Sequence, residues 1–150
     1  MKFLLVDDEE MVLAELVYAV RAVRPDAEIS AFQSGKEAWE AAQQTKYDVL
    51  ITDIAPLEMK GAELANLIHE KYPDTQILFQ TAELEMILLR SGYPVERCIY
   101  KPVNEKAMKE KLDMLDSLPP FAMASSEDKI PKGLIAKLKY FFRKIKKLLS

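Results

Sequence analysis

The sequence predicts an α/β domain with a doubly wound parallel sheet of five strands, followed by a C-terminal amphipathic helix. Two observations support this prediction. Short apolar runs alternate with amphipathic segments five times, and the first run, KFLLV, is continuously apolar after Lys2 rather than alternating in polarity. Continuous apolar runs are typical of strands that are buried on both faces of a sheet. The amphipathic segments between them are expected to form helices that cover the two faces.

The strands are expected where the apolar runs are short and stop at polar or acidic residues. KFLLV and YDVLIT are the clearest of these runs, and the second leads directly into Asp53. The predicted strands are Lys2–Val6, Glu28–Phe32, Tyr47–Thr52, Gln76–Gln80 and Arg97–Tyr100.

The helices are expected where apolar residues recur with helical spacing. In the first of them, Leu13, Leu16 and Val20 fall on one face. Ser34 and Glu37 form a Ser-x-x-Glu capping box, which marks the start of the second. The predicted helices are Glu10–Val23, 34–43, Gly61–Glu70, Ala82–Leu89 and Asn104–Leu115.

The composition is that of an ordinary globular domain with an extension. Of the 150 residues, 49% are apolar and 30% are charged. Cys98 is the single cysteine, so no internal disulfide can form, and this fits a reducing compartment. The first apolar run is only four residues long before acidic residues begin, which is too short for a signal peptide or a membrane span. We expect a cytoplasmic protein.

Chemically active residues follow four of the predicted strands. Asp7 and Asp8 follow the first, Asp53 the third, Thr81 the fourth and Lys101 the fifth. In an open parallel sheet, ligands bind beyond the carboxyl ends of the strands. Each residue taken alone also has a structural interpretation, as a helix N-cap, a loop residue or a solvated charge.

Three carboxylates at one edge repel one another unless a cation binds there. Hard oxygen ligands beside a phosphate site are what Mg²⁺ prefers. A cation would leave one carboxylate free to attack a phosphoryl donor and form an aspartyl-phosphate. Thr81 and Lys101 would then hold the phosphoryl oxygens.

The ordered set of motifs resembles the receiver domains of two-component response regulators, the superfamily that includes CheY. The resemblance covers residues 1–116 and rests on Val6–Glu9, Asp53, the pair Thr81-Ala82 and the pair Lys101-Pro102. It implies the flavodoxin-like strand order 2-1-3-4-5, a cis peptide before Pro102 and a phosphoacceptor at Asp53.

The same resemblance implies the roles of the site residues. Asp8, Asp53 and the backbone carbonyl of Ala55 would bind Mg²⁺ directly, whereas Asp7 would act through water. The phosphoryl donor would be a histidine kinase, a phosphotransfer protein or a small compound such as acetyl phosphate. The domain would then be a signalling switch and not an enzyme, because its only catalysis is its own phosphorylation and slow dephosphorylation.

The sequence departs from the family pattern in several places. The proline usually found four residues after the phosphoacceptor is replaced by Leu57, with Pro56 before it. Cys98 stands where the family usually has an aromatic residue, and Tyr93-Pro94 occupies a turn that commonly contains glycine. A phosphorylation-independent interaction module, that is, a degenerate receiver, is therefore the alternative. An aspartate-nucleophile hydrolase is weaker, because the second acid it needs would be Ala55.

Charge is divided unevenly along the chain. Residues 1–130 hold 14 Lys/Arg against 24 Asp/Glu, whereas residues 131–150 hold seven Lys/Arg and no acid. Residues 117–130 read as a linker, and residues 131–150 as a basic amphipathic helix in which Pro131 suits the first turn. Its apolar stripe consists of residues 134, 135, 138, 141, 142, 145, 148 and 149. His69 is expected to be a surface residue far from the site.

The basic helix leaves three interpretations open. It could dock on the acidic body, lie on an anionic membrane surface, or bind a partner groove or a second copy as a homodimer. Sequence-specific DNA binding is not expected, because a single helix is too small for the modules that read DNA.

Overall fold

The computed structural model describes residues 1–54, 59–123 and 132–149. Ala55, Pro56, Leu57 and Pro131 lie outside this range, so the predictions made for them rest on sequence alone. The chain forms two compact units. The first comprises Met1–Ala82 and Glu96–Phe121, and the second comprises Glu83–Val95 and Ala122–Ser150.

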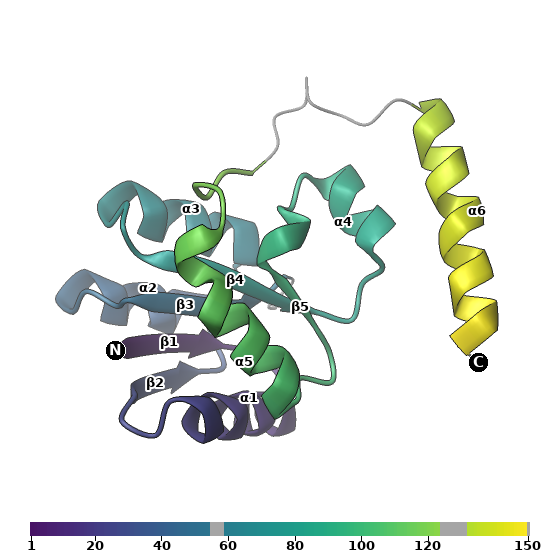
Figure 1. The fold of residues 1–150 in the computed structure, drawn as a ribbon. Coiled ribbons are helices and arrows are strands. Elements are labelled where there is room, and N and C mark those ends of the chain that lie inside the picture. Colours follow the sequence, from purple (N-terminus) through teal and green to yellow (C-terminus); the bar gives the residue numbers. More distant parts are fainter. Residues whose placement is uncertain (55–58, 124–131, 150) are drawn as a thin grey trace. The chain divides into compact units, whose positions relative to one another are not determined.

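The first unit is built on a five-stranded sheet in which every neighbouring pair of strands is parallel (Figure 1). The order β2-β1-β3-β4-β5 confirms the predicted fold class and strand order. The strands are β1 (Lys2–Val6), β2 (Glu28–Phe32), β3 (Val49–Asp53), β4 (Gln76–Thr81) and β5 (Cys98–Tyr100). The third strand starts at Val49 rather than at the predicted Tyr47, because its pairing with β1 and β4 begins at Val49.

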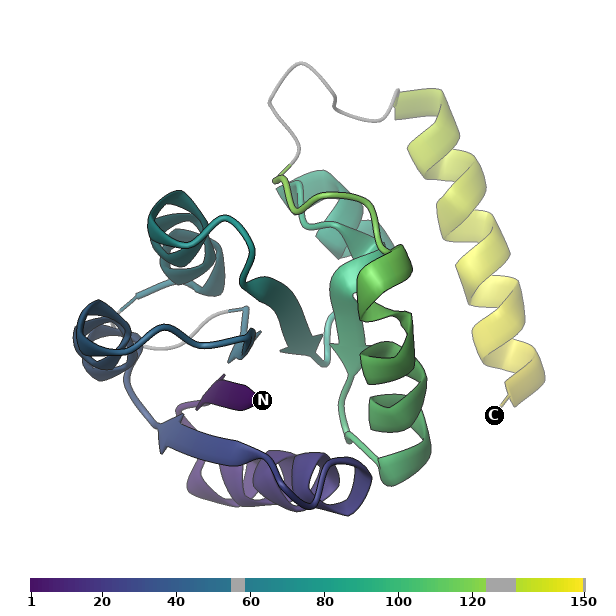
Figure 2. The ribbon, with the colours of Figure 1, turned by 60° about the vertical axis from the view of Figure 1, so that its left-hand side comes forward.

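Helices of the first unit cover both faces of the sheet (Figure 2). α1 (Glu10–Val23) and α5 (Glu105–Met114) pack on one face, and α2 (Gly35–Gln44) and α3 (Gly61–Lys71) pack on the other. A 3-10 helix, η1 (Val95–Arg97), leads into β5, and another, η2 (Leu115–Ser117), follows α5.

The core explains why the apolar runs are continuous. Phe3 and Leu5 of β1 face α1 and α5, whereas Leu4 lies between them on the same strand and is also fully buried. Burying one such side chain stabilises the fold by about 1.5–3 kcal/mol. A strand with helices on both faces therefore gains this stabilisation at every position, so its sequence does not alternate.

Two helix starts are capped as their sequences indicate. The backbone N–H of Glu37 donates to Ser34 Oγ at 3.3 Å, which confirms the capping residue of α2. The backbone N–H of Ala107 donates to Asn104 Oδ1 at 2.8 Å and caps α5 in the same way. Both caps satisfy N–H groups that the first helical turn leaves without partners.

The end of the first unit packs against α3. Phe121 is buried and meets the His69 ring edge to face, with 5.2 Å between centroids. Arg97 Nη2 donates to the carbonyl oxygen of Pro119 at 2.5 Å and so fixes the same segment. His69, expected at the surface, is half-buried, because the Phe121 ring packs against it. The domain boundary at residue 116 stays a prediction.

The second unit contains α4 (Glu85–Ser91) and α6 (Lys132–Leu149). α4 ends at Gly92, which adopts the left-handed conformation (φ 81°) that glycine tolerates without strain. α6 confirms the predicted C-terminal helix over its described residues. Within residues 1–54, 59–123 and 132–149, no helix is long and apolar enough to cross a membrane.

Candidate functional site

The candidate site lies where four strands of the sheet end. Val6 pairs with Thr52 in the sheet, so Asp7 and Asp53 follow at adjacent strand ends. Thr81 is the last residue of β4, and the backbone N–H of Lys101 donates to its carbonyl oxygen at 2.8 Å. The parallel order of the strands therefore brings together residues that are far apart in the sequence.

Three carboxylates form the centre of the site. Asp7, Asp8 and Asp53 each offer an oxygen atom, and these atoms lie within 4.8 Å of one another. Asp7 is fully buried, Asp8 is half-buried, and the side chain of Asp53 is 15% exposed. Ala55, the predicted carbonyl ligand, lies outside the described residues.

Lys101 joins two of these carboxylates. Its Nζ lies 2.9 Å from Asp7 Oδ2 and 3.2 Å from Asp53 Oδ1. The peptide between Lys101 and Pro102 is cis, as the resemblance implied. Lys101 is thus not a solvated surface charge, since its side chain is only 18% exposed.

The helix-cap interpretations of the acidic and hydroxyl residues do not hold. The N-cap of α1 is Glu9, and Asp7 Oδ1 accepts a hydrogen bond from the Glu9 backbone N–H at 2.9 Å. α4 starts after Leu84, three residues beyond Thr81, so Thr81 is not its N-cap and the predicted start at Ala82 was wrong. Thr81 is buried at the end of β4.

Gln80 is a site residue that sequence reasoning missed. Its side chain is fully buried, and Nε2 donates to Asp7 Oδ2 at 2.8 Å. Gln80 Oε1 accepts no hydrogen bond from any described residue. The sequence did contain a signal for Gln80, because this polar residue directly follows the apolar run ILF of a buried strand. Burying a polar group without a hydrogen-bond partner costs about 1–3 kcal/mol, so an amide at such a position indicates a specific partner.

Burial and charge shift the pKa values of the two central groups. Burial raises the pKa of Asp53 above its usual 3.8, and the charge of Asp7 adds to this, although Lys101 opposes both. For Lys101, burial lowers the pKa, but the hydrogen bond and charge of Asp7 and the charge of Asp53 outweigh it, so the pKa of Lys101 is raised. Lys101 therefore stays protonated between the carboxylates.

The residues present fit a divalent cation. One ammonium faces three carboxylates, so negative charge remains uncompensated in a partly buried site. All the offered atoms are carboxylate oxygens, the ligand type that Mg²⁺ prefers. The buried Gln80 Oε1 is a further acceptor that has no donor among the described residues.

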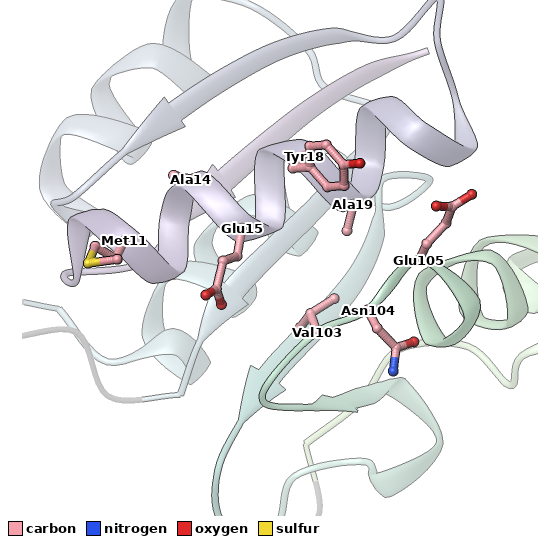
Figure 3. A pocket seen from close by; sticks show the side chains of 8 residues that line it. All are labelled: Met11, Ala14, Glu15, Tyr18, Ala19, Val103, Asn104 and Glu105. Carbon is pink, nitrogen blue, oxygen red and sulfur yellow. The ribbon is translucent and has the colours of Figure 1, made fainter.

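A groove lies near the site on the face that α1 and α5 cover. It measures about 490 Å³ and is lined by α1, including Met11 and Tyr18, and by the segment that enters α5, including Val103 (Figure 3). Met11 is 79% exposed and Tyr18 is 73% exposed. A smaller hollow of about 200 Å³ shares Glu15 and Val103 with the groove and extends to Lys101.

The structure also describes Cys98, which stands where the family usually has an aromatic residue, and the nearby Tyr100. Cys98 is buried in β5, whereas Tyr100 is 39% exposed. The place that an aromatic residue usually takes in the family is thus filled by a buried cysteine, and Tyr100, two residues further along β5, is partly exposed.

Comparison with known proteins agrees with this geometry. The chain matches the family model of the response regulator receiver domain over residues 3–113. The transcriptional regulatory protein LytR of Staphylococcus aureus (strain N315) is 26% identical over 113 residues, which are 75% of this chain and 46% of LytR. The response regulator receiver protein CpdR of Brucella abortus is 34% identical over 80 residues, which are 53% of this chain and 65% of CpdR.

A solved structure shows the same fold. The chemotaxis protein CheY4 of Vibrio cholerae superposes with a TM-score of 0.63 at 23% identity, covering 76% of this chain and 97% of CheY4. The chain belongs to the response regulator receiver domain family. It spans about half the length of the LytR proteins that it matches. Receiver domains are signalling switches that interact with histidine kinases or phosphotransfer proteins and bind Mg²⁺ at an acidic pocket.

Replacing Asp53 by asparagine should stabilise the first unit when divalent cations are absent. Because the folded-state pKa of Asp53 is raised, the folded protein holds the Asp53 proton more tightly than the unfolded chain does. Asp53 therefore contributes less to stability as pH rises from about 3.8 through the raised pKa. The advantage of Asp53→Asn in urea unfolding should grow over this range and then level off.

Asp74→Asn is the matched control. A hydrogen bond to Lys46 lowers the pKa of Asp74, which is fully exposed, so removing its charge should not stabilise the protein. A lower urea midpoint for Asp53→Asn than for the unchanged chain at neutral pH would contradict the predicted repulsion in the site.

Proposed function

We propose that the chain is a receiver switched by Mg²⁺-dependent phosphorylation of Asp53. The observation that carries the proposal is the contact of one ammonium, Lys101, with two members of a three-carboxylate cluster. This arrangement supplies a nucleophile, a site for a cation and a positive charge for the product in one place.

The proposed roles of the described residues are supported by their positions. Asp8 and Asp53, with Asp7 acting through water, would hold the cation, and the carbonyl of Ala55 is proposed as a further ligand. When bound, Mg²⁺ offsets the carboxylate charge and that of the incoming phosphoryl group.

Phosphorylation transfers one phosphoryl group to a carboxylate oxygen of Asp53. That oxygen attacks phosphorus, the bond from phosphorus to the donor's leaving group breaks, and acetate leaves when the donor is acetyl phosphate. Lys101 already lies 3.2 Å from Asp53 Oδ1, so its ammonium can pair with the new phosphoryl oxygens. Thr81, at the end of the adjacent strand, is the proposed hydroxyl donor.

A histidine kinase or phosphotransfer protein is the proposed physiological donor. The groove of about 490 Å³ suits its docking, because the groove exposes Met11 and Tyr18 and the hollow beside it extends to Lys101. A donor seated there is close to the carboxylate cluster. Exposed apolar and aromatic side chains are also the usual anchors of protein interfaces.

The chain is proposed to divide into a receiver domain (1–116), a linker (117–130) and an output helix (131–150). The basic, amphipathic character of the output helix supports a role in protein or membrane interaction. The proposed location is the cytoplasm, with membrane association through this helix.

Incubation with acetyl phosphate and Mg²⁺ should add one phosphoryl group, measured by intact mass. Asp53→Ala should abolish the adduct, because no other carboxylate of the cluster is paired in the same way with Lys101 and left partly exposed. Asp48→Ala is a control near the start of β3 and should be phosphorylated normally.

An absent adduct, or an adduct that persists in Asp53→Ala, would contradict the proposal. The alternative, a phosphorylation-independent interaction module, predicts no adduct. It also predicts equal partner binding by the unchanged chain and by Asp53→Ala.

A further inference from the structure

The first inference concerns the surface of α6. Three residues of its apolar stripe, Phe141, Leu148 and Leu149, are between 56% and 83% exposed, whereas Phe142 and Ile145 of the same stripe are half-buried. Exposed apolar side chains on one helix indicate an interaction surface. Residues 131–150 contain seven Lys/Arg and no acid, so whatever covers this surface must tolerate a strongly positive helix.

Four of the seven basic residues lie at the borders of the apolar stripe. With 3.6 residues per turn, Lys139 and Lys146 follow one border, and Lys137 and Lys144 follow the other. Lysines at such borders can extend their ammonium groups toward phosphates while the stripe between them enters an apolar layer.

The same placement disfavours a second copy of the chain. In a helix pair joined through the stripe, border residues of the two copies would face each other, and here they are all lysines. Interhelical pairs of this kind need opposite charges to be stabilising. The apolar stripe needs an apolar layer, and the lysines at its borders need negative charge beside that layer. The surface of an anionic bilayer offers both, in its acyl chains and its phosphate groups.

We propose that α6 binds anionic lipid bilayers by lying in the interface with its apolar stripe toward the acyl chains. The proposal commits the output role of residues 131–150 to a lipid surface, and it does not depend on phosphorylation of Asp53. Each basic residue near an anionic surface strengthens binding roughly fivefold at physiological salt. This attraction offsets the repulsion expected between the acidic residues 1–130 and the same surface.

Co-sedimentation of the full chain with vesicles tests the proposal. The chain should pellet with equimolar phosphatidylcholine and phosphatidylserine vesicles, and not with phosphatidylcholine alone, and added salt should weaken this binding. Phe141→Ser should weaken binding about tenfold, because it removes a large side chain from the stripe. Tyr140→Ser is the matched control: its exposed ring lies off the stripe, beside Lys144, and its loss should change binding little.

Three outcomes would overturn the proposal. The first is failure of the chain to bind either kind of vesicle, which would favour an acidic protein partner. The second is vesicle binding that survives deletion of residues 131–150. The third is a dimer that forms without lipid and that Phe141→Ser dissociates. The assay contains no phosphodonor, so a failure here leaves phosphorylation of Asp53 untouched, and the reverse also holds.

A second inference comes independently from Gln80. Its buried amide must present nitrogen to Asp7, because a carboxylate only accepts hydrogen bonds. Oε1 therefore turns away from Asp7 and accepts no hydrogen bond from any described residue. A buried unsatisfied acceptor on a side chain that contacts Asp7 of the carboxylate cluster calls for a donor that binds there.

We infer that Gln80 is a positioning residue for the cation. Nε2 holds Asp7 in place, and Oε1 accepts a hydrogen bond from a water molecule of bound Mg²⁺. This inference rests on the proposed Mg²⁺ site. Residues in such supporting positions typically change metal affinity about 10–100-fold when they are replaced.

Calorimetric titration with Mg²⁺, together with urea unfolding without the ion, tests the inference. Gln80→Met keeps the size of the side chain but removes both polar atoms, so it should lower Mg²⁺ affinity about tenfold. The ion-free protein should also lose some stability, because the buried Asp7 loses a hydrogen bond. Unchanged affinity with reduced stability would show a purely structural role. Failure of the unchanged chain to bind Mg²⁺ would instead contradict the proposed metal site itself.

Discussion

The paired contact of Lys101 with Asp7 and Asp53 is the interaction on which the site depends. It holds two acidic residues from β1 and β3 beside a cation from the end of β5. It compensates only part of their charge, because Asp8 lies in the same cluster. Lys101 thus allows the carboxylates to lie together, and the negative charge that remains could be balanced by a divalent cation.

The parallel sheet makes this cluster possible. Its strands all end at one edge, so residues separated by more than ninety positions, such as Asp7 and Lys101, meet in space. The apolar side chains of β1 and β3 are buried from both sides by helices, and this burial stabilises the fold enough to tolerate charge repulsion at the strand ends. The same five strands thus form the hydrophobic core and bring the site residues together at their ends.

The fold could be predicted because its signals are local. Continuous apolar runs, helical spacing and the Ser34 cap each occur within a few residues, and the strand order followed from the family resemblance. The grouping of Asp7, Asp53 and Lys101 could be expected because each residue ends or follows a predicted strand. The start of α4 was placed three residues early, since Thr81 resembles an N-cap in sequence but remains within β4.

Other features depend on contacts that no local pattern reveals. Gln80 reaches Asp7 because β4 is in register with β3, so Gln80 lies beside Asp53 rather than in the apolar core. His69 is covered only because Phe121, which lies beyond the last strand and helix of the sheet, returns to pack on α3. Both depend on the three-dimensional register of distant segments.

Fluorine NMR of beryllofluoride, a mimic of the phosphoryl group, tests the central claim most directly. The account predicts a protein-bound fluoride signal that appears only when Mg²⁺ is present and that is missing from Asp53→Asn, because both the cation and the Asp53 carboxylate are required. A bound signal without Mg²⁺, or one that persists in Asp53→Asn, would contradict the account. So would the absence of any bound signal from the unchanged chain with Mg²⁺.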